Sequence, residues 1–299
     1  MIAHTKTEGW LPERVVILGG TGFVGGAATR WLRDRDIDVL TLSSKDINLL
    51  SGDAAQNLAG LLAPDDTLVV ISAIAPVKNV EMLEQNIRMG RAVCDALGAQ
   101  HVDHLLYVSS DAVYDDSDKP MTEESCAEPG SLHGVMHLAR ELMFADAAGG
   151  TPYGILRPTL IYGPEDPHNG YGPNMYRRRL AAGEPVFLFG KGEERRDHVY
   201  VDDVGELLGR MVLSRSEGKL NAVTGKVVSF HEIADLVIAE FDSPPPIEYR
   251  PRSGPMPHNG YRAFDAAGVA AAFPDFAFMT IEDGVKRCHD LASAVAGPN

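Results

Sequence analysis

The chain has 299 residues and a formal net charge of −15, because 42 Asp and Glu outnumber 27 Lys and Arg. Hydrophobic residues make up 44% of it, which suffices for one large α/β unit or for two domains that share a cleft. A charge this negative argues against a nucleic acid or an acidic membrane as partner, since phosphate groups would meet an unfavourable overall field.

Cysteine usage and hydropathy narrow the class further. Three widely spaced cysteines provide neither a disulfide framework nor a Cys-x-x-Cys metal motif. No stretch reaches the roughly 18 apolar residues of a membrane span, and the N-terminal segment lacks the apolar core of a signal peptide. We therefore expect a soluble, cytoplasmic protein.

Short apolar runs alternate with amphipathic stretches through the first half of the chain. We predict strands at residues 14–18, 38–42, 67–71, 104–108 and 153–157. We predict helices around residues 27–35, 80–97 and 131–147. Strands that alternate with helices imply crossover connections, a parallel sheet and helices on both of its faces. Farther along, Ser229 with Glu232, and Thr280 with Asp283, have the spacing of helix N-terminal caps.

A glycine-rich loop directly follows the first predicted strand and opens a helix. Its three spaced glycines are Gly19, Gly22 and Gly25. One glycine suits a tight turn, one lets backbone N–H groups approach a pyrophosphate, and one permits close helix–sheet packing. The phosphates would lie at the positive end of the helix dipole. We predict a dinucleotide bound at Gly19, Thr21, Gly22, Phe23, Val24 and Gly25.

The Gly-x-x-Gly-x-x-Gly spacing resembles that of the short-chain dehydrogenase/reductase superfamily. Residues 106–114 resemble the strand ending in Ser-Ser-x-x-Val-Tyr of its extended branch, the NAD-dependent epimerase/dehydratase family. Residues 156–164 resemble that family's Leu-Arg…Tyr-Gly-Pro segment, and residues 196–204 its Arg-Asp-x-x-Tyr-Val-Asp-Asp segment. The resemblance implies a Rossmann-like, doubly wound parallel sheet in residues 1–164. A smaller C-terminal α/β substrate-binding domain in residues 165–299, with segments returning to the first, would complete the fold.

The resemblance also implies a nicotinamide cofactor, with Ala73, Asn86, Ser109 and Pro158 among its contacts. The end of the second predicted strand distinguishes NADP from NAD. Ser43, Ser44 and Lys45 come there before the first acid, Asp46. Hydroxyl groups and an ammonium suit a 2′-phosphate, which a carboxylate would repel, so we predict NADP rather than NAD. In the alternative, Asp46 binds the ribose and Lys45 is merely solvated.

The family's catalytic Tyr-x-x-x-Lys pair is absent, and its place is taken by His133 and His137. Three interpretations remain open. His133 acts as general acid or base, since its ordinary pKa is near neutrality. Alternatively, the site binds its ligands but has lost or changed its redox chemistry. In the third, the two histidines bind zinc, although no third ligand is evident and we predict no metal.

The residues around this pair bear on the chemistry. Ser110 matches the family's hydroxyl residue that bonds the reacting oxygen. Asp111 and Ala112 match the Asp-Glu pair of 4,6-dehydratases, and alanine in the second place disfavours dehydration. We predict Ser110, Asp111, His133 and His137 as the catalytic group. An apolar stripe of Val135, Leu138, Leu142 and Ala145 should pack on the core and leave the histidines facing the cleft.

The predicted substrate side is locally basic. Residues 171–200 carry six Lys and Arg against four Asp and Glu, which reverses the sign of the overall charge. Forked guanidinium groups suit a diphosphate. Arg196 matches a family arginine that contacts substrate phosphates, and we add Asn174, Arg178 and Tyr162 as substrate contacts.

These features predict an NAD(P)-dependent oxidoreductase or isomerase acting on a nucleotide sugar or a similar alcohol or carbonyl compound. The alternative is a non-redox protein that binds NAD(P) and a nucleotide-like ligand as a sensor. A homodimer is expected from the resemblance.

Overall fold

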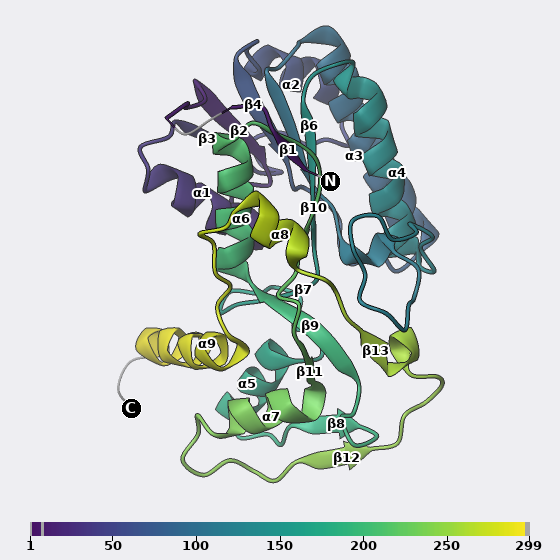
Figure 1. Cartoon of the computed structure of the whole chain (residues 1–299), viewed down its shortest axis with the longest axis vertical. Helices are drawn as coiled ribbons and strands as arrows, with labels where there is room; N and C mark the ends of the chain where they lie inside the picture. Colours follow the sequence, from purple (N-terminus) through teal and green to yellow (C-terminus); the bar gives the residue numbers. More distant parts are fainter. Residues whose placement is uncertain (1, 7–8, 297–299) are drawn as a thin grey trace.

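A seven-stranded sheet forms the larger half of the molecule in a computed structural model that describes residues 2–6 and 9–296 (Figure 1). The strand order is β1-β10-β6-β5-β4-β2-β3, and every pairing is parallel except that of β1 with β10. Its strands are β1 (Ala3–His4), β2 (Arg14–Leu18), β3 (Val39–Leu42), β4 (Asp66–Val70), β5 (His104–Val108), β6 (Tyr153–Pro158) and β10 (Ser216–Ala222). The predicted doubly wound α/β fold is confirmed.

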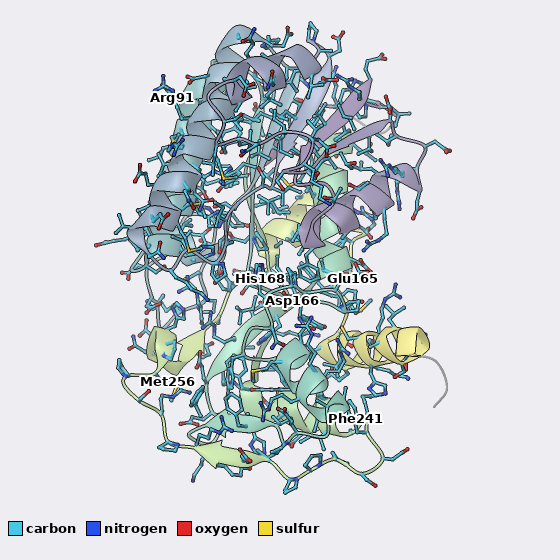
Figure 2. All side chains as sticks on the ribbon, turned by 180° about the vertical axis from the view of Figure 1, so that it is seen from behind. Arg91, Glu165, Asp166, His168, Phe241 and Met256 are labelled. Carbon is cyan, nitrogen blue, oxygen red and sulfur yellow. The ribbon has the colours of Figure 1, made fainter. Side chains whose placement is uncertain are left out.

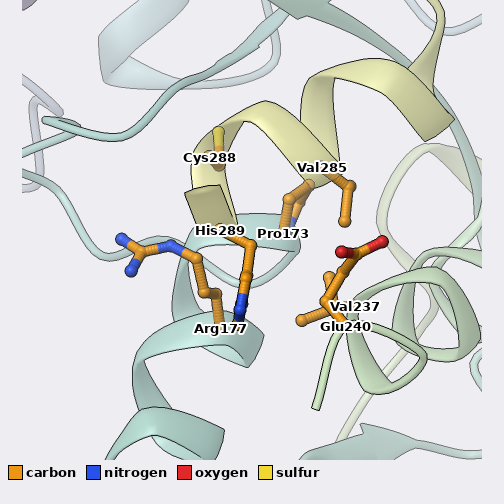
Figure 3. A pocket seen from close by; sticks show the side chains of 7 residues that line it. All are labelled: Pro173, Arg177, Val237, Glu240, Val285, Cys288 and His289. Carbon is orange, nitrogen blue, oxygen red and sulfur yellow. The ribbon is translucent and has the colours of Figure 1, made fainter. Parts of the chain in front are cut away.

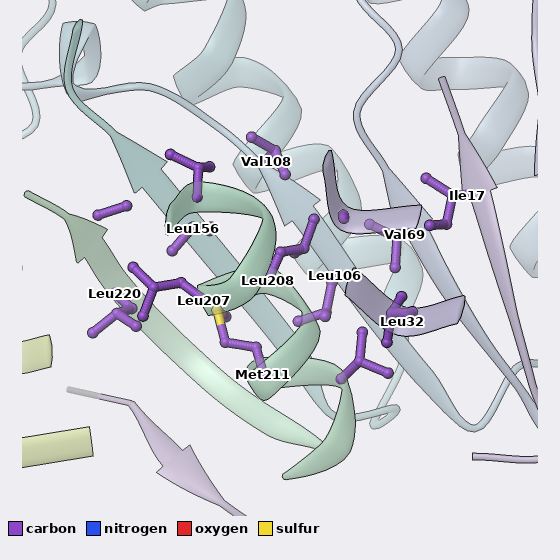
Figure 4. Packing of buried hydrophobic residues seen from close by; sticks show 14 of the residues in the cluster. Ile17, Leu32, Val69, Leu106, Val108, Leu156, Leu207, Leu208, Met211 and Leu220 are labelled. Carbon is purple, nitrogen blue, oxygen red and sulfur yellow. The ribbon is translucent and has the colours of Figure 1, made fainter. Parts of the chain in front are cut away.

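Helices cover both faces of this sheet. One layer contains α1 (Phe23–Arg33) and α6 (Val201–Leu213). The other contains α2 (Ala54–Leu61), α3 (Val80–Ala99) and α4 (Leu132–Ala148). Figure 4 shows how Ile17, Leu106 and Leu208 meet in the fully buried core beneath the α1–α6 layer. The five predicted strands and three predicted helices therefore form the scaffold of the first half.

The smaller half is built on a second sheet, in which β7 (Leu160–Tyr162), β11 (Val227–Ser229) and β13 (Tyr261–Arg262) all pair with β9 (Arg195–Tyr200). A separate pair joins β8 (Phe187–Phe189) to β12 (Glu248–Arg250). The helices here are α5 (Pro173–Ala181), α7 (Phe230–Ile238) and α9 (Ile281–Ala296). The predicted capping signal before α7 is a capping box between Ser229 and Glu232.

The chain returns to the first sheet after entering the second half. Helix α6 packs on α1 and leads into β10, while α8 (Ala267–Ala272) adds Val269 to the same core. The close approach of α6 requires glycine, because a Cβ on Gly209 would lie 2.2 Å from the Trp31 ring. Among the described residues, no helix is both long and apolar enough to cross a bilayer.

The predicted apolar stripe of α4 is wrong. Val135 and Leu142 are exposed to 40% and 66%, and Ala145 is exposed too, while Leu138 is half-buried. The buried face instead carries Gly134, Met136, His137, Arg140, Glu141 and Phe144. Polar side chains can face the interior here because most of them find partners there, as the sites below show.

Candidate functional site

The glycine loop between β2 and α1 is a cradle that only glycine can form. Gly19 has a φ of +88°, and a Cβ on Gly25 would lie 2.1 Å from the Gly19 carbonyl oxygen. Gly22 caps α1 with no side-chain hydrogen bond, so the first-turn N–H groups remain open to an acceptor. These groups are what a pyrophosphate binds, and the residues therefore fit a dinucleotide.

The end of β4 forms the other side of this cradle. A Cβ on Gly19 would lie 3.0 Å from the Ser72 backbone nitrogen, so the loop and the segment containing Ala73 are in close contact. Strands β3 and β4 flank β2 on opposite sides, and this switch in strand order is where such folds bind ligands. Asn86, predicted to contact the cofactor, instead bonds the backbone of Ile74 and Met82 and is fully buried. Its role is to hold this segment.

The turn after β3 holds the residues predicted to choose between NADP and NAD. The Asp46 carboxylate accepts hydrogen bonds from the Ser43 N–H at 2.8 Å and the Ser43 hydroxyl at 2.6 Å. These bonds lower the pKa of Asp46 and direct its carboxylate into the turn. Ser44 and Lys45 are exposed at the same turn. The carboxylate is therefore already engaged, whereas the Lys45 ammonium is accessible.

The first turn of α4 meets the short segment η1 (Asp111–Val113), which follows β5. A Cβ on Gly134 would lie 2.0 Å from the Ala112 carbonyl oxygen, so no other residue permits this approach. Ser131 caps the helix by accepting the Gly134 N–H. Ser110 accepts the Ala112 N–H at 3.1 Å and forms the cap of η1. The structure thereby brings the turn of Ser110 and Asp111 against the turn that carries His133.

His133 is held by the segment after β4. Its Nδ1 accepts the Val77 N–H at 3.4 Å, so the proton of the neutral ring lies on Nε2. Burial lowers the pKa of His133, and nearby His168 acts in the same direction, while Asp111 opposes them. His133 is therefore a neutral imidazole that donates through Nε2 at neutral pH.

His137 lies one turn deeper and bonds the core. Its Nδ1 is 2.8 Å from the Tyr107 hydroxyl, and its ring stands edge-on to that of His133 with centroids 4.7 Å apart. Burial, and then the charges of His133 and Arg140, lower the pKa of His137 well below its usual range. Tyr107 packs in the core, and burial raises its pKa to about 12.

Arg140 is the fixed cation beside this pair. It is fully buried, donates from Nη1 to the Ser72 carbonyl at 2.9 Å, and lies over the Tyr107 ring. Its Nε and Nη2 have no hydrogen-bond partner among the described residues. It packs against α3, where a Cβ on Gly90 would lie 3.4 Å from Arg140 Cγ.

Ser109 and Pro158, both predicted to contact the cofactor, lie at the ends of β5 and β6 and are buried. The Ser109 hydroxyl donates to Glu141 at 2.5 Å, and Glu141 also accepts two bonds from Arg157. Ser109 is thus part of a buried ion-pair network. Asp111 is similarly engaged, since it accepts from Arg262 Nε at 2.8 Å. Its carboxylate positions η1.

Two arginines of the smaller half share one buried carboxylate. Arg196 Nη1 lies 3.1 Å from one oxygen of Glu194, and Arg252 Nη1 lies 3.5 Å from the other. Arg196 Nε and Arg252 Nε and Nη2 have no partner in the part of the chain that the structure describes. Two guanidinium groups with free donors and one shared counter-charge suit a diphosphate. Sequence analysis missed Arg252, because its only signal was a lone arginine in a loop rich in Pro and Gly.

The loop between β7 and α5 lies between the two halves, as Asp166 and His168 show in Figure 2. Asn174 and Arg178, predicted to contact substrate, bond the Asp166 carboxylate and backbone carbonyl, respectively. Arg178 also bonds Asn169. Tyr162, the third of these predicted contacts, is buried against Tyr200 and α9.

A small pocket lies between α5, α7 and α9 (Figure 3). It is lined by Pro173, Arg177, Val237, Glu240, Val285, Cys288 and His289. Its volume of ≈ 10 Å³ is enough for about one water molecule. The described residues contain no group of three or more His, Cys, Asp or Glu side chains arranged for a metal, so the His133–His137 pair has no third ligand.

The strand order and the glycine loop together define a Rossmann-like α/β fold with a smaller half built on a second sheet. The profile of the NAD dependent epimerase/dehydratase family matches residues 15–223, and the chain belongs to this family. The predicted resemblance is thus confirmed.

Three known proteins give the scale of the similarity. A Methanocaldococcus jannaschii protein named "Putative UDP-glucose 4-epimerase" is 24% identical, covering 91% of this chain and 96% of its own. The Thermotoga maritima UDP-glucose 4-epimerase with UDP-glucose is 20% identical at a TM-score of 0.82, covering 95% and 99%. A GDP-L-fucose synthetase from Naegleria fowleri bound to NADP is 17% identical at a TM-score of 0.82, covering 97% and 95%.

Proposed function

We propose that the protein is an NAD(P)-dependent oxidoreductase or isomerase that acts on a nucleotide sugar. The observation that carries the proposal is the close approach of Gly134 to Ala112, which sets His133 beside the Ser110 turn. A nicotinamide ring, when bound, supplies hydride exchange with a substrate carbon. The substrate classes in the related structures, UDP-glucose among them, support the choice of substrate.

The chain's own residues hold the two ends of the cleft. The N–H groups at the start of α1 bind the cofactor's pyrophosphate, and Arg196 with Arg252 binds the substrate's diphosphate. Between them, His133 donates a hydrogen bond from Nε2 to a substrate oxygen, and Ser110 donates from its hydroxyl. A neutral imidazole donor of this kind polarises a carbonyl without carrying a charge itself.

Turnover tests this proposal directly. UDP-glucose is incubated with NADP⁺ or NAD⁺, and reduced cofactor and new sugar products are followed. We expect turnover that falls by about a hundredfold in His133→Ala, in the range removed with a positioned acid or base. His231→Asn, in an exposed pair with Asp235, should keep the wild-type rate. A rate unaffected by His133→Ala would contradict the role given to that residue.

The cofactor preference rests on the turn after β3. We propose NADP over NAD, because Lys45 is exposed while the Asp46 carboxylate is bonded to Ser43. Dissociation constants for both cofactors decide it. Lys45→Ala should weaken NADP binding by about tenfold, roughly 1.4 kcal/mol, and leave NAD binding unchanged. Tighter binding of NAD by the wild type would overturn the preference.

The second candidate is a binding protein without redox chemistry. It is favoured by one observation. Position 137, where the family has its lysine, holds an imidazole whose Nδ1 is bonded to the Tyr107 hydroxyl and which carries no ammonium charge. In that case nucleotide sugars bind and change the affinity for NADP, but no product forms. The turnover assay above separates the two candidates.

We also propose a homodimer formed through α4. Leu132, Val135 and Leu142 on this helix are 36%, 40% and 66% exposed, which leaves an apolar face uncovered. Sedimentation equilibrium should show a dimer for the wild type and a monomer for Leu142→Glu. Leu291→Glu, on exposed apolar surface of α9, is the matched control and should stay dimeric.

A further inference from the structure

A histidine–carboxylate pair joins the two halves of the molecule next to the site described above. His258 lies in the short segment η2 (Pro257–Gly260), and Asp116 lies in the loop that follows η1. The His258 Nδ1 and Asp116 Oδ1 atoms form a short hydrogen bond. No described residue bonds His258 through Nε2. The pair has the form of a dyad in which a carboxylate orients an imidazole.

The contact determines which nitrogen carries the proton. Two groups approach His258 Nδ1: an Asp116 carboxylate oxygen, which can only accept, and Arg262 Nη1 at 3.0 Å, which can only donate. The carboxylate oxygen is the nearer of the two, so we assign Nδ1 as its donor, which leaves the lone pair of the neutral ring on Nε2. Arg262 fixes the carboxylate, since its Nη1 is 2.9 Å from the same Asp116 oxygen. Arg262 is 1% exposed and also bonds Asp111 through Nε at 2.8 Å. One guanidinium therefore ties this dyad to the turn of Ser110.

The backbone at His258 adds to this evidence. His258 and Asn259 have φ values of +51° and +52°, so two consecutive residues with side chains occupy the left-handed region. Such residues cost on the order of 1 kcal/mol each and cluster where function requires a fixed side chain. The conformation is held by the bonds of His258 and of Arg262 to the Asp116 carboxylate.

The dyad is linked both to the arginine pair of the smaller half and to the turn of Ser110. Strand β13 runs parallel to β9 with Arg262 opposite Arg196. The charged groups that act on His258 are Arg196, Arg262 and Asp116. Burial and then Arg196 lower the pKa of His258, and Asp116 opposes them. The ring is therefore neutral at neutral pH, with its lone pair available.

We propose that His258, oriented by Asp116, accepts a proton from a hydroxyl of the bound substrate. The Nε2 lone pair takes the proton, the O–H electron pair stays on the substrate oxygen, and the imidazolium that forms is paired with Asp116. The role complements that of His133, whose accessible nitrogen donates. The inference rests on the proposed function, because the substrate must lie against Arg196 and Arg252.

Binding of UDP-glucose as a function of pH tests the proposal by calorimetry between about pH 5 and pH 8. Protonation of His258 adds a charge near the diphosphate, so wild-type affinity should rise by about tenfold as the pH falls. In His258→Asn this rise should disappear, while asparagine tolerates the left-handed backbone. In Asp116→Asn it should move to lower pH, because the imidazolium loses its counter-charge.

The control is His231→Asn, which removes a histidine paired with Asp235 on the surface of α7 and should keep the wild-type profile. If His258 were only structural, His258→Asn would weaken binding equally at every pH, and that result would overturn the proposal. Retention of the full pH dependence in this variant would overturn it as well.

A second measurement keeps the failure of the proposed function separate. ¹⁵N nuclear magnetic resonance of the imidazoles reports the tautomer of His258 without any ligand. We expect a protonated Nδ1 and an unprotonated Nε2 at neutral pH, and a mixture of tautomers in Asp116→Asn. Absence of UDP-glucose binding by the wild type would count against the proposed substrate class alone. A protonated Nε2 in the wild type would overturn the role of His258 whatever the substrate.

Discussion

The two sides of the proposed site differ in whether main-chain or side-chain groups act. On the proposed cofactor side the candidate groups are backbone N–H groups, and glycine sets their positions, as the close approach of Gly25 to Gly19 shows. On the catalytic side the groups are side chains, although another glycine, Gly134, sets the distance between α4 and η1. Where main-chain groups act, the backbone geometry permits few residue types at a position. Where side chains act, the same backbone permits many more.

The substitution Gly25→Ala tests the proposed cofactor side and should have the largest effect. The new Cβ would lie 2.1 Å from a backbone oxygen, so α1 must move away from the loop. We expect the affinity for NADP or NAD to fall by more than about a thousandfold, roughly 4.1 kcal/mol. Fluorescence titration measures it, with circular dichroism to verify folding.

Gly26→Ala is the matched control for this substitution, because its Cβ would meet only the flexible end of Arg30 at 3.5 Å. It should bind the cofactor as the wild type does. Equal affinities for the Gly25 and Gly26 variants would mean that the loop does not hold the dinucleotide.

The substitution Gly134→Ala tests the side that carries His133 and Ser110. Its Cβ would lie 2.0 Å from the Ala112 oxygen, so the turn of His133 must separate from that of Ser110. A shift of about 1 Å costs on the order of a hundredfold in rate, and we expect that loss in turnover with little change in cofactor affinity. Gly130→Ala, with nothing within 4 Å of its Cβ, should keep the wild-type rate. Parallel loss of cofactor binding would show that the two sides are not separable.

The third prediction concerns stability, where the two halves each bury a neutral histidine. Burial lowers the pKa of His104 to about 4 and that of His198 to about 3. The unfolded chain takes up these protons near pH 6.5 and the folded chain does not, so the free energy of unfolding falls as the pH drops below that value. Asp197, whose pKa burial raises to about 6, acts in the opposite direction.

His104→Gln isolates one of these contributions, since glutamine can keep the bond to the Ser216 carbonyl. Between pH 7 and pH 5 the variant should lose about 2 kcal/mol less of its free energy of unfolding than the wild type, at about 1.4 kcal/mol per pH unit. Urea unfolding at both pH values measures this. Exposed His101→Gln serves as the control, and an identical loss in all three proteins would contradict the assignment.

Local patterns predicted the part of the fold that depends on sequence neighbours. The strand at 14–18, the glycine loop after it and the capping box of Ser229 are all local in the chain. The buried face of α4 was predicted wrongly, because Glu141 on this helix is paired with Arg157 on strand β6. Similarly, the Asp116–His258 pair joins residues 142 positions apart, and neither residue belongs to a motif.

The candidate site also contains residues that sequence motifs predict and residues that only long-range contacts reveal. His133, Ser110 and Arg196 were predicted because family motifs place them, whereas Arg252 becomes a candidate only through its shared contact with Glu194. Asn86, Tyr162, Asn174 and Arg178 were assigned to ligands, yet each bonds or packs on the protein itself. Residue type identifies a polar group, but only the fold shows whether that group already has a partner.

Buried Arg140 restricts which side chain position 137 can hold. A lysine there would bring an ammonium next to that guanidinium, with Tyr107 and Ser72 offering no negative charge between them. Positions 137 and 140 are therefore coupled, because an ammonium at 137 would be buried beside the guanidinium at 140 with no counter-charge between them.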